Sequence, residues 1–293
     1  MKSLKESILS STNTGKASFL FPKTKDELFL MLCKEISKKG WNCDLNHIKT
    51  NKITDMEHLF GSGSGLQRFN GDISKWDVSN VTNMEGMFST SEFNGNISGW
   101  DVSKVTNMKG MFADSVFNQP LDKWNVSKVT DMSRMFAGSK FNQSINKWNV
   151  SKVENMMNMF NNSPFNQPIN KWNVSKVEDM ARMFQQSVFN QDISDWNVSN
   201  VKYMNSMFND SEFNQDISNW DVSNVESMAF MFCDSDFNKP IDKWKVNNVE
   251  NMWGMFAGSE FNQDISGWKI NKRCRTNDMF KNCKIKENYK PKH

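Results

Sequence analysis

Tryptophan recurs every 24 residues along most of the chain, and few folds are compatible with so regular an interval. Phe-Asn and Met-Phe dipeptides keep the same interval, so the pattern repeats as whole units. A period of this length indicates a repeat protein whose units stack on one another. The sequence predicts nine units within residues 61–284, with an insertion at 61–68. The repeated tryptophans are Trp76, Trp100, Trp124, Trp148, Trp172, Trp196, Trp220, Trp244 and Trp268.

The spacing inside one unit predicts its local structure. Apolar residues from Val81 to Phe88 recur at intervals of three, three and one, which places them on one side of a short helical or 3₁₀ turn. Trp76 and Val78 lie two residues apart, which places both on the same face of an extended stretch. Each unit is therefore expected to be a bent coil with an apolar inside, and a coil needs neighbours to bury that side.

Asparagine follows the first Phe of every unit, and serine precedes that Phe by two residues in eight of the nine units. An amide at one level of every coil can hydrogen-bond to the backbone of the next coil and satisfy groups that are costly to bury. Catalysis needs one site rather than nine, so we interpret both positions as structural. The predicted asparagine ladder comprises Asn70, Asn94, Asn118, Asn142, Asn166, Asn190, Asn214, Asn238 and Asn262.

The two ends of the array require caps, because the outer coils leave an apolar face uncovered. Thr24 and Glu27 form a capping box, and the apolar stripe that follows stops at Gly40. We therefore predict an N-terminal cap helix and a degenerate first coil within residues 22–60. Residues 1–21 are expected to be a flexible segment, and residues 285–293 a basic tail that frays.

Charge and composition argue against several function classes. The net charge of +3 is far below the basic excess of a dedicated nucleic-acid binder, so no specific nucleic acid is expected. The three histidines lie far apart in the sequence, and no nucleophile with a base, phosphate-binding glycine loop or metal-ligand cluster is visible. We expect no enzyme activity, no cofactor and no metal.

The cysteines and the N-terminal residues bear on where the chain resides. Five cysteines without a CxxC pair argue against a closed disulfide framework and favour a reduced compartment. The first residues lack the apolar run of a signal peptide, and no stretch of about 18 apolar residues follows. We expect a chain that neither inserts into a membrane nor is exported by the usual route.

Outward-facing positions of the units offer a first candidate binding surface. In units three to five, lysines occupy the position before Trp and the position before the second Val; these are Lys123, Lys147, Lys171, Lys128, Lys152 and Lys176. Acidic residues follow in nearby positions of the next units, namely Asp192, Asp195, Asp216 and Asp221. A basic patch beside an acidic one suits a partner of complementary charge. The alternative is a solvated surface on which other carboxylates offset the lysines, namely Asp131, Glu154, Glu178 and Asp179.

Aromatic residues at unusual positions offer a second candidate surface. Phe230 and Trp253 occupy positions that other units fill mainly with small or polar residues, so both are expected to be exposed. Together with Tyr203 they form a candidate contact surface near the C-terminal end. The repeated Trp and Phe are expected instead to form the core, because nine exposed tryptophans would create a large adhesive patch.

The unit resembles the repeat of the BspA-type leucine-rich-repeat family, a variant first noted in mycoplasma lipoproteins and known from bacterial, protist and phage surface proteins. The resemblance rests on FNQDISNWDVSNV at 213–225 and on the M-x-x-MF ending of the units, and it covers about residues 22–285. It implies a leucine-rich-repeat-like solenoid with short parallel strands on one face and short helical or 3₁₀ turns on another.

The resemblance also implies interaction rather than catalysis, since some family members are adhesins or bind host proteins. We therefore expect a non-enzymatic module that presents its faces to a protein or glycan partner. The family's phage members make a structural virion or assembly component the alternative. Without a signal peptide, a cytoplasmic or virion-associated location is expected rather than Sec secretion.

Overall fold

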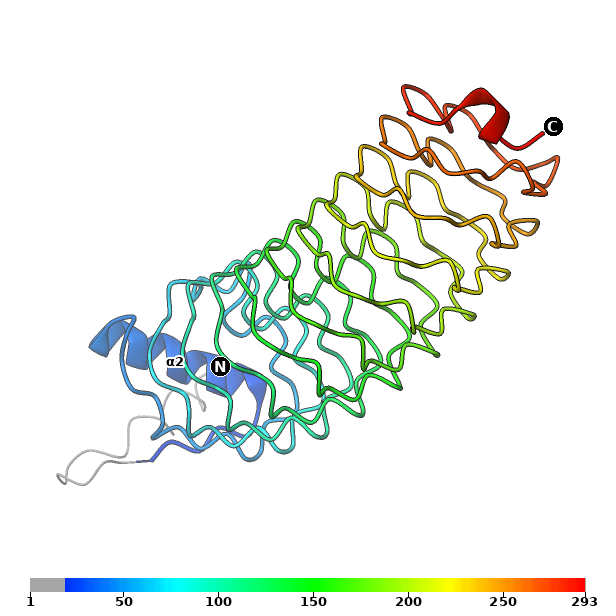
Figure 1. Ribbon diagram of the computed structural model, residues 1–293. Helices are drawn as coiled ribbons and strands as arrows, with labels where there is room; N and C mark the ends of the chain where they lie inside the picture. Colours follow the sequence, from blue (N-terminus) through cyan, green and yellow to red (C-terminus); the bar gives the residue numbers. More distant parts are fainter. Residues whose placement is uncertain (1–18, 293) are drawn as a thin grey trace.

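The computed structural model describes residues 19–292, which wind into a long stack of coils (Figure 1). Helix α2 (Lys25–Lys39) lies at the N-terminal end, and the short 3₁₀ helix η1 (Glu287–Tyr289) lies at the C-terminal end. The coils between them consist of turns and extended residues. Within residues 19–292, no helix has the length and apolar character needed to cross a membrane. The chain is a repeat protein, as the tryptophan interval predicts.

Helix α2 begins and ends where the sequence predicts. Oγ1 of Thr24 accepts a hydrogen bond from the backbone N–H of Glu27 at 3.2 Å, which satisfies a donor in the first turn. At the other end, the N–H of Gly40 donates to the carbonyl of Ile36 at 2.7 Å, and its φ of 87° favours glycine. The apolar stripe is buried in the core shared with the coils and comprises Leu28, Leu32 and Ile36. The helix therefore caps the first coil.

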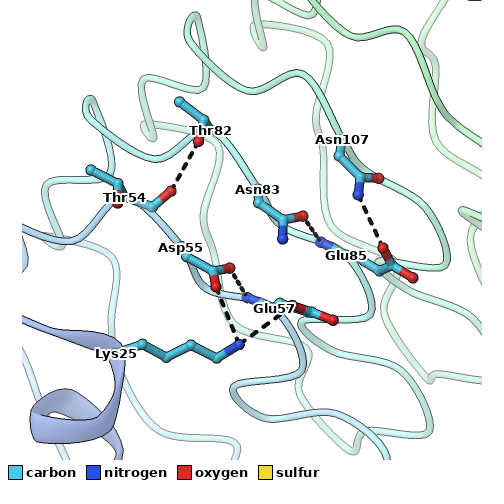
Figure 2. A network of polar contacts seen from close by, with 8 residues as sticks. All are labelled: Lys25, Thr54, Asp55, Glu57, Thr82, Asn83, Glu85 and Asn107. Carbon is cyan, nitrogen blue, oxygen red and sulfur yellow. Dashed lines mark hydrogen bonds and ion pairs between the residues drawn. The ribbon is translucent and has the colours of Figure 1, made fainter.

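Polar side chains fasten α2 to the first coils (Figure 2). Nζ of Lys25 lies 3.4 Å from Oδ2 of Asp55 and 3.7 Å from Oε2 of Glu57. Oδ1 of Asp55 accepts the N–H of Glu57 at 2.9 Å, and Asn83 accepts that of Glu85 at 3.1 Å in the next coil. Such Asx turns explain why Asp or Asn recurs at this position, because the side chain holds the bend of each coil.

Neighbouring coils meet at this same position through parallel β-bridges. Within residues 19–292 every bridge is isolated, so the pairing is narrower than the short parallel strands that the sequence predicts. Hydrogen bonds between coils continue into the turns that follow, but left-handed residues there interrupt the extended backbone that a strand requires. The bridged residues run from Asp55 through Asn83, Asn107, Asp131, Asn155, Asp179, Tyr203, Ser227 and Asn251 to Arg275.

The segment after each bridge is a series of β-turns, and the expectation of a helical or 3₁₀ turn is wrong there. The N–H of Met87 donates to the carbonyl of Met84 at 3.2 Å, and Gly86 between them has a left-handed φ of 57°. Thr90, in the following turn, has a φ of 56°. A right-handed helix cannot continue through left-handed residues. The apolar side chains still face inward, so turns and a helix produce a similar sequence spacing.

Hydrogen bonds between coils run in one direction along this turn segment. The N–H groups of Met84, Gly86 and Phe88 donate to carbonyls of the next coil at 2.8–2.9 Å. Their own carbonyls accept N–H groups from within the same coil, at 3.0–3.3 Å. The carbonyls of the alternate residues face the other way and accept N–H groups of the preceding coil. Each turn segment therefore presents N–H donors toward the C-terminal end of the stack and carbonyl acceptors toward the N-terminal end.

The interior is a continuous spine of aromatic and thioether side chains. Phe88 and Phe112, at the same position of consecutive coils, stack with ring centroids 5.6 Å apart. The repeated tryptophans are only 3–4% exposed. Each donates its indole N–H to a carbonyl of the preceding coil, as Trp100 does to Ile73 at 3.2 Å. The predicted burial of the repeated aromatic residues is confirmed.

The asparagine ladder runs along one side of the stack. Oδ1 of Asn166 accepts the backbone N–H of Asn190 and the side-chain amide of Gln191, each at 3.0 Å, and neighbouring coils repeat the first bond. Most ladder side chains are half-buried rather than buried. The repeated serines mostly bond within their own coil, as Ser115 Oγ does to the carbonyl of Phe112 at 2.8 Å. These serines therefore mainly close turns within a coil, although Ser91 Oγ donates to the carbonyl of Gln67 in the preceding coil at 3.2 Å.

Residues at both ends join the stack, where the sequence predicts a flexible segment and a fraying tail. Leu20 forms a parallel bridge with Ile48, so residues 19–21 belong to the first coil, whereas residues 1–18 and 293 lie outside the described residues. Ile285 is buried, and the N–H of Ile265 donates to the carbonyl of Tyr289 at 3.0 Å. The tail is held because its few apolar residues cover one side of the last coil.

Replacing Asn166 with alanine should lower the free energy of unfolding by about 1–3 kcal/mol, because the N–H of Asn190 and the amide of Gln191 lose their acceptor. Urea denaturation followed by tryptophan fluorescence measures this. Lys171→Ala is the control, since Lys171 is an exposed residue of the same unit. Equal midpoints for the two variants would show that the ladder contributes nothing to stability.

Candidate binding surfaces

The six predicted lysines are all exposed and form two lines across consecutive coils, which we call the basic columns. In the third unit, Lys123 and Lys128 each end a tight turn. Trp124 and Val126, between those turns, are buried, so the lysines point away from the core. The alternation of buried and exposed residues thus places the columns on one outer face. They comprise Lys123, Lys147 and Lys171, and Lys128, Lys152 and Lys176.

Three of the four carboxylates that could offset these lysines have other partners, and the fourth, Glu154, forms no ion pair with them in the part of the chain that the structure describes. No ion pair within residues 19–292 includes a lysine of the basic columns. Glu178 instead pairs with Lys202, with 2.8 Å between Oε2 and Nζ. Asp131 and Asp179 accept backbone N–H groups of their own Asx turns, at 2.7 and 2.8 Å. The positive charge of the columns is therefore not neutralised by direct contacts.

The acidic residues of the following coils are exposed as well. The backbone N–H and the hydroxyl of Ser194 hold the pKa of Asp192 below its ordinary value, and Ser218 does the same for Asp216. Both carboxylates therefore stay ionised at neutral pH. The structure thus places exposed acidic side chains on the coils that follow the basic columns. The four residues are Asp192, Asp195, Asp216 and Asp221.

The three predicted aromatic residues lie on three consecutive coils. Tyr203 is 40% exposed and Trp253 is 38% exposed, whereas Phe230 is half-buried. The rings of Phe230 and Trp253 lie 5.3 Å apart, centroid to centroid. Arg275, on the next coil, places its guanidinium carbon 5.3 Å from the Trp253 ring. We call these four residues the aromatic patch.

Two members of the patch differ from the residues that most other coils have at the same positions. Tyr203 stands at the bridge position, where most coils have the Asp or Asn of an Asx turn. Phe230 has a φ of 57°, and the equivalent residues of other coils are left-handed as well, among them Arg134 and Asn158 at 58°. Its ring lies over Gly254, where an added Cβ would be 2.5 Å from a ring carbon. The ring of Phe230, rather than its backbone, therefore distinguishes it from the equivalent residues.

Sequence reasoning missed Arg275. The stacking on Trp253 could not be inferred from either residue alone, because the two lie 22 positions apart. The available signal was the bridge position itself, where Arg275 replaces the usual Asp or Asn. Arginine over an indole face gains a cation–π interaction and prearranges both side chains.

The cysteines and the metal-ligating side chains are scattered over the described part of the chain. Within residues 19–292 all five cysteines are free thiols, and no group of three or more His, Cys, Asp or Glu could hold a metal ion. Burial, together with the adjacent carboxylate of Asp234, raises the pKa of Cys233 to about 12. A thiol with so high a pKa is a poor nucleophile at neutral pH.

Comparison with known proteins identifies a family. The family described as "Mycoplasma protein of unknown function, DUF285" matches residues 32–140, 113–212, 139–235 and 187–291. The chain belongs to this family. The four overlapping matches cover the same region as the coils, so the family's domain here is the repeat array. No curated protein and no solved structure matches the chain.

Cys233 should react slowly with iodoacetamide. At about pH 8 roughly a quarter of an ordinary cysteine is thiolate, against about one part in ten thousand at a pKa of about 12. Asp234→Asn should speed the reaction, because the neighbouring negative charge disappears. Mass spectrometry of the alkylated peptide gives the rate, and Asp236→Asn is the control. A fast reaction of unmodified Cys233 would contradict the assignment.

Proposed function

We propose that the chain is a leucine-rich-repeat-like solenoid of the BspA type that acts as a non-enzymatic binding module. It presents the sides of its coil stack to a protein or glycan partner. The observation that carries this proposal is the aromatic patch, in which Trp253 is exposed while the nine repeated tryptophans are buried. A cytoplasmic or virion-associated location is part of the same proposal.

The composition of the aromatic patch supports a contact role. Trp, Tyr and Arg are the residues most enriched at the centres of protein interfaces, because they bury large areas with little loss of side-chain freedom. Trp253 is already held by Phe230 and Arg275, so little ordering is needed when a partner binds.

The basic columns support a second part of the proposal, the approach of the partner. Six exposed lysines on three consecutive coils concentrate positive charge on one face, with exposed acidic residues on the coils beyond. Such an arrangement speeds association with a partner of complementary charge and orients it. The aromatic patch would then supply most of the affinity and the columns would supply the rate.

Tyr203→Ala combined with Trp253→Ala should weaken partner binding by about 2 kcal/mol or more, because the two exposed rings are removed from the contact. A glycan array and affinity capture with mass spectrometry identify the ligand, and its affinity is then measured by calorimetry. Val116→Ala combined with Val188→Ala is the matched control, since both valines are exposed apolar residues outside the patch. Equal affinities for both double variants would refute the role of the patch.

Charge reversal of Lys123, Lys147 and Lys171 to Glu should slow association about tenfold or more at low salt, with a smaller effect at high salt. The matched control reverses Lys75, Lys243 and Lys245, which are exposed lysines on distant coils. Surface plasmon resonance measures the association rate of the identified ligand with each variant. The same association rate for both triple variants would show that the basic columns do not contribute to partner association.

A further inference from the structure

The last coil leaves a row of backbone N–H groups without partners. In the coil before it, Met252, Gly254, Phe256 and Gly258 donate to carbonyls of the last coil at 2.8–2.9 Å. The equivalent N–H groups of the last coil donate to no acceptor within residues 19–292. They face the end of the stack, where the next coil would lie. We call this row the donor edge, and it comprises Thr276, Asp278, Phe280 and Asn282.

The donor edge lacks acceptors of its own. The carbonyls of Thr276, Asp278 and Phe280 are taken by turn N–H groups of the last coil, at 3.0–3.1 Å. Asp278 and Asn282 have left-handed φ angles of 54° and 58°, and successive N–H groups around such residues form concave anion-binding nests. A regular β-strand would bring N–H groups of its own against this edge. A ligand rich in acceptors fits it better.

Charge at the C-terminal end favours an anionic ligand. Residues 269–293 contain nine Lys and Arg against two Asp and Glu, whereas residues 69–268 contain 16 against 24. The net charge of +3 conceals this separation, which is why the sequence pointed away from polyanions. Asp278, the acidic residue on the edge, lies 3.9 Å from the ammonium of Lys281. The end of the stack is therefore a basic surface around unpaired N–H donors.

An apolar hollow lies beside the donor edge. It has a volume of about 420 Å³, and Ile270, Met279, Phe280 and Pro291 contribute apolar side chains to its wall. Two ion pairs also line it, Lys281 with Asp278 and Lys290 with Glu287. Phe280 is the last ring of the phenylalanine column and stacks on Phe256 at 5.8 Å, with no further ring above it. A carbohydrate polyanion has little to place in such a hollow, whereas a peptide carries apolar side chains as well as carboxylates and carbonyls.

We propose that the C-terminal end of the stack binds an acidic peptide segment of a partner protein. Carbonyl and carboxylate oxygens of the segment accept from the donor edge, basic side chains such as Lys281 and Lys284 pair with its carboxylates, and one apolar side chain enters the hollow. This end site is separate from the lateral aromatic patch and basic columns.

The test uses the full chain and a short fluorescein-labelled peptide in which Glu alternates with Leu. Fluorescence anisotropy should show saturable binding, weakened about tenfold by Lys281→Glu combined with Lys284→Glu, since two charge-assisted contacts are lost. Lys52→Glu combined with Lys75→Glu is the matched control, because it makes the same charge change at exposed lysines near the N-terminal end of the stack, outside the basic columns. Equal weakening in both variants, or none in the first, would overturn the proposal.

Hydrogen exchange tests the donor edge directly. The amides of Thr276, Asp278, Phe280 and Asn282 should exchange more slowly when the peptide is bound, and unchanged exchange there would overturn the proposal. Thr276→Pro removes one donor and should weaken binding further. A peptide with Ser in place of Leu should bind less tightly, because the hollow stays empty. Equally tight binding of heparin or of an oligothymidylate would assign the end to polyanions in general and refute a peptide site.

Discussion

Each coil satisfies its backbone and its aromatic side chains only through its neighbours. Before the last coil, every second N–H group of the turn segment finds its acceptor one coil away, and so does the indole N–H of every repeated Trp, as Met84 and Trp100 show. The phenylalanine rings stack across the same interval. A single coil would leave these groups exposed or unpaired, which is costly for both polar and apolar atoms. Stability in such an array is a property of interfaces between coils.

The interval of 24 residues was enough to predict the stack, its core and its outer faces. Burial of Trp124 and exposure of Lys123 follow from simple alternation, which holds whether the backbone forms strands or isolated bridges. The cap helix was also predictable, because Thr24 and Gly40 carry local signals that act within a few residues. These features depend on local chemistry or on exact repetition, and both are visible in one sequence.

The turn segment was not predictable in the same way. Left-handed residues at Gly86 and Thr90 change the backbone path without changing the apolar spacing, so a helical turn and a series of β-turns look alike in the sequence. The candidate surfaces likewise include one that the sequence could predict and others that it could not. The basic columns could be predicted from alternation, whereas the contact of Arg275 with Trp253 and the donor edge depend on how one coil sits on another.

The turns also give the stack a polarity. Because the carbonyls of Met84, Gly86 and Phe88 close turns within their own coil, this segment directs its N–H groups toward the C-terminal end, and every coil repeats the arrangement. Outside the segment the direction is reversed at a few positions, as where the carbonyl of Thr82 accepts the N–H of Thr106. Aligned peptide dipoles leave partial positive charge where N–H groups are unpaired, as at the start of a helix. The two ends therefore differ chemically. The acceptor end lies at the first coil, where α2 brings Lys25 to the carboxylates of Asp55 and Glu57 (Figure 2). At the donor end, basic side chains add to the partial positive charge instead of balancing it, so the charge of this end favours an anionic partner.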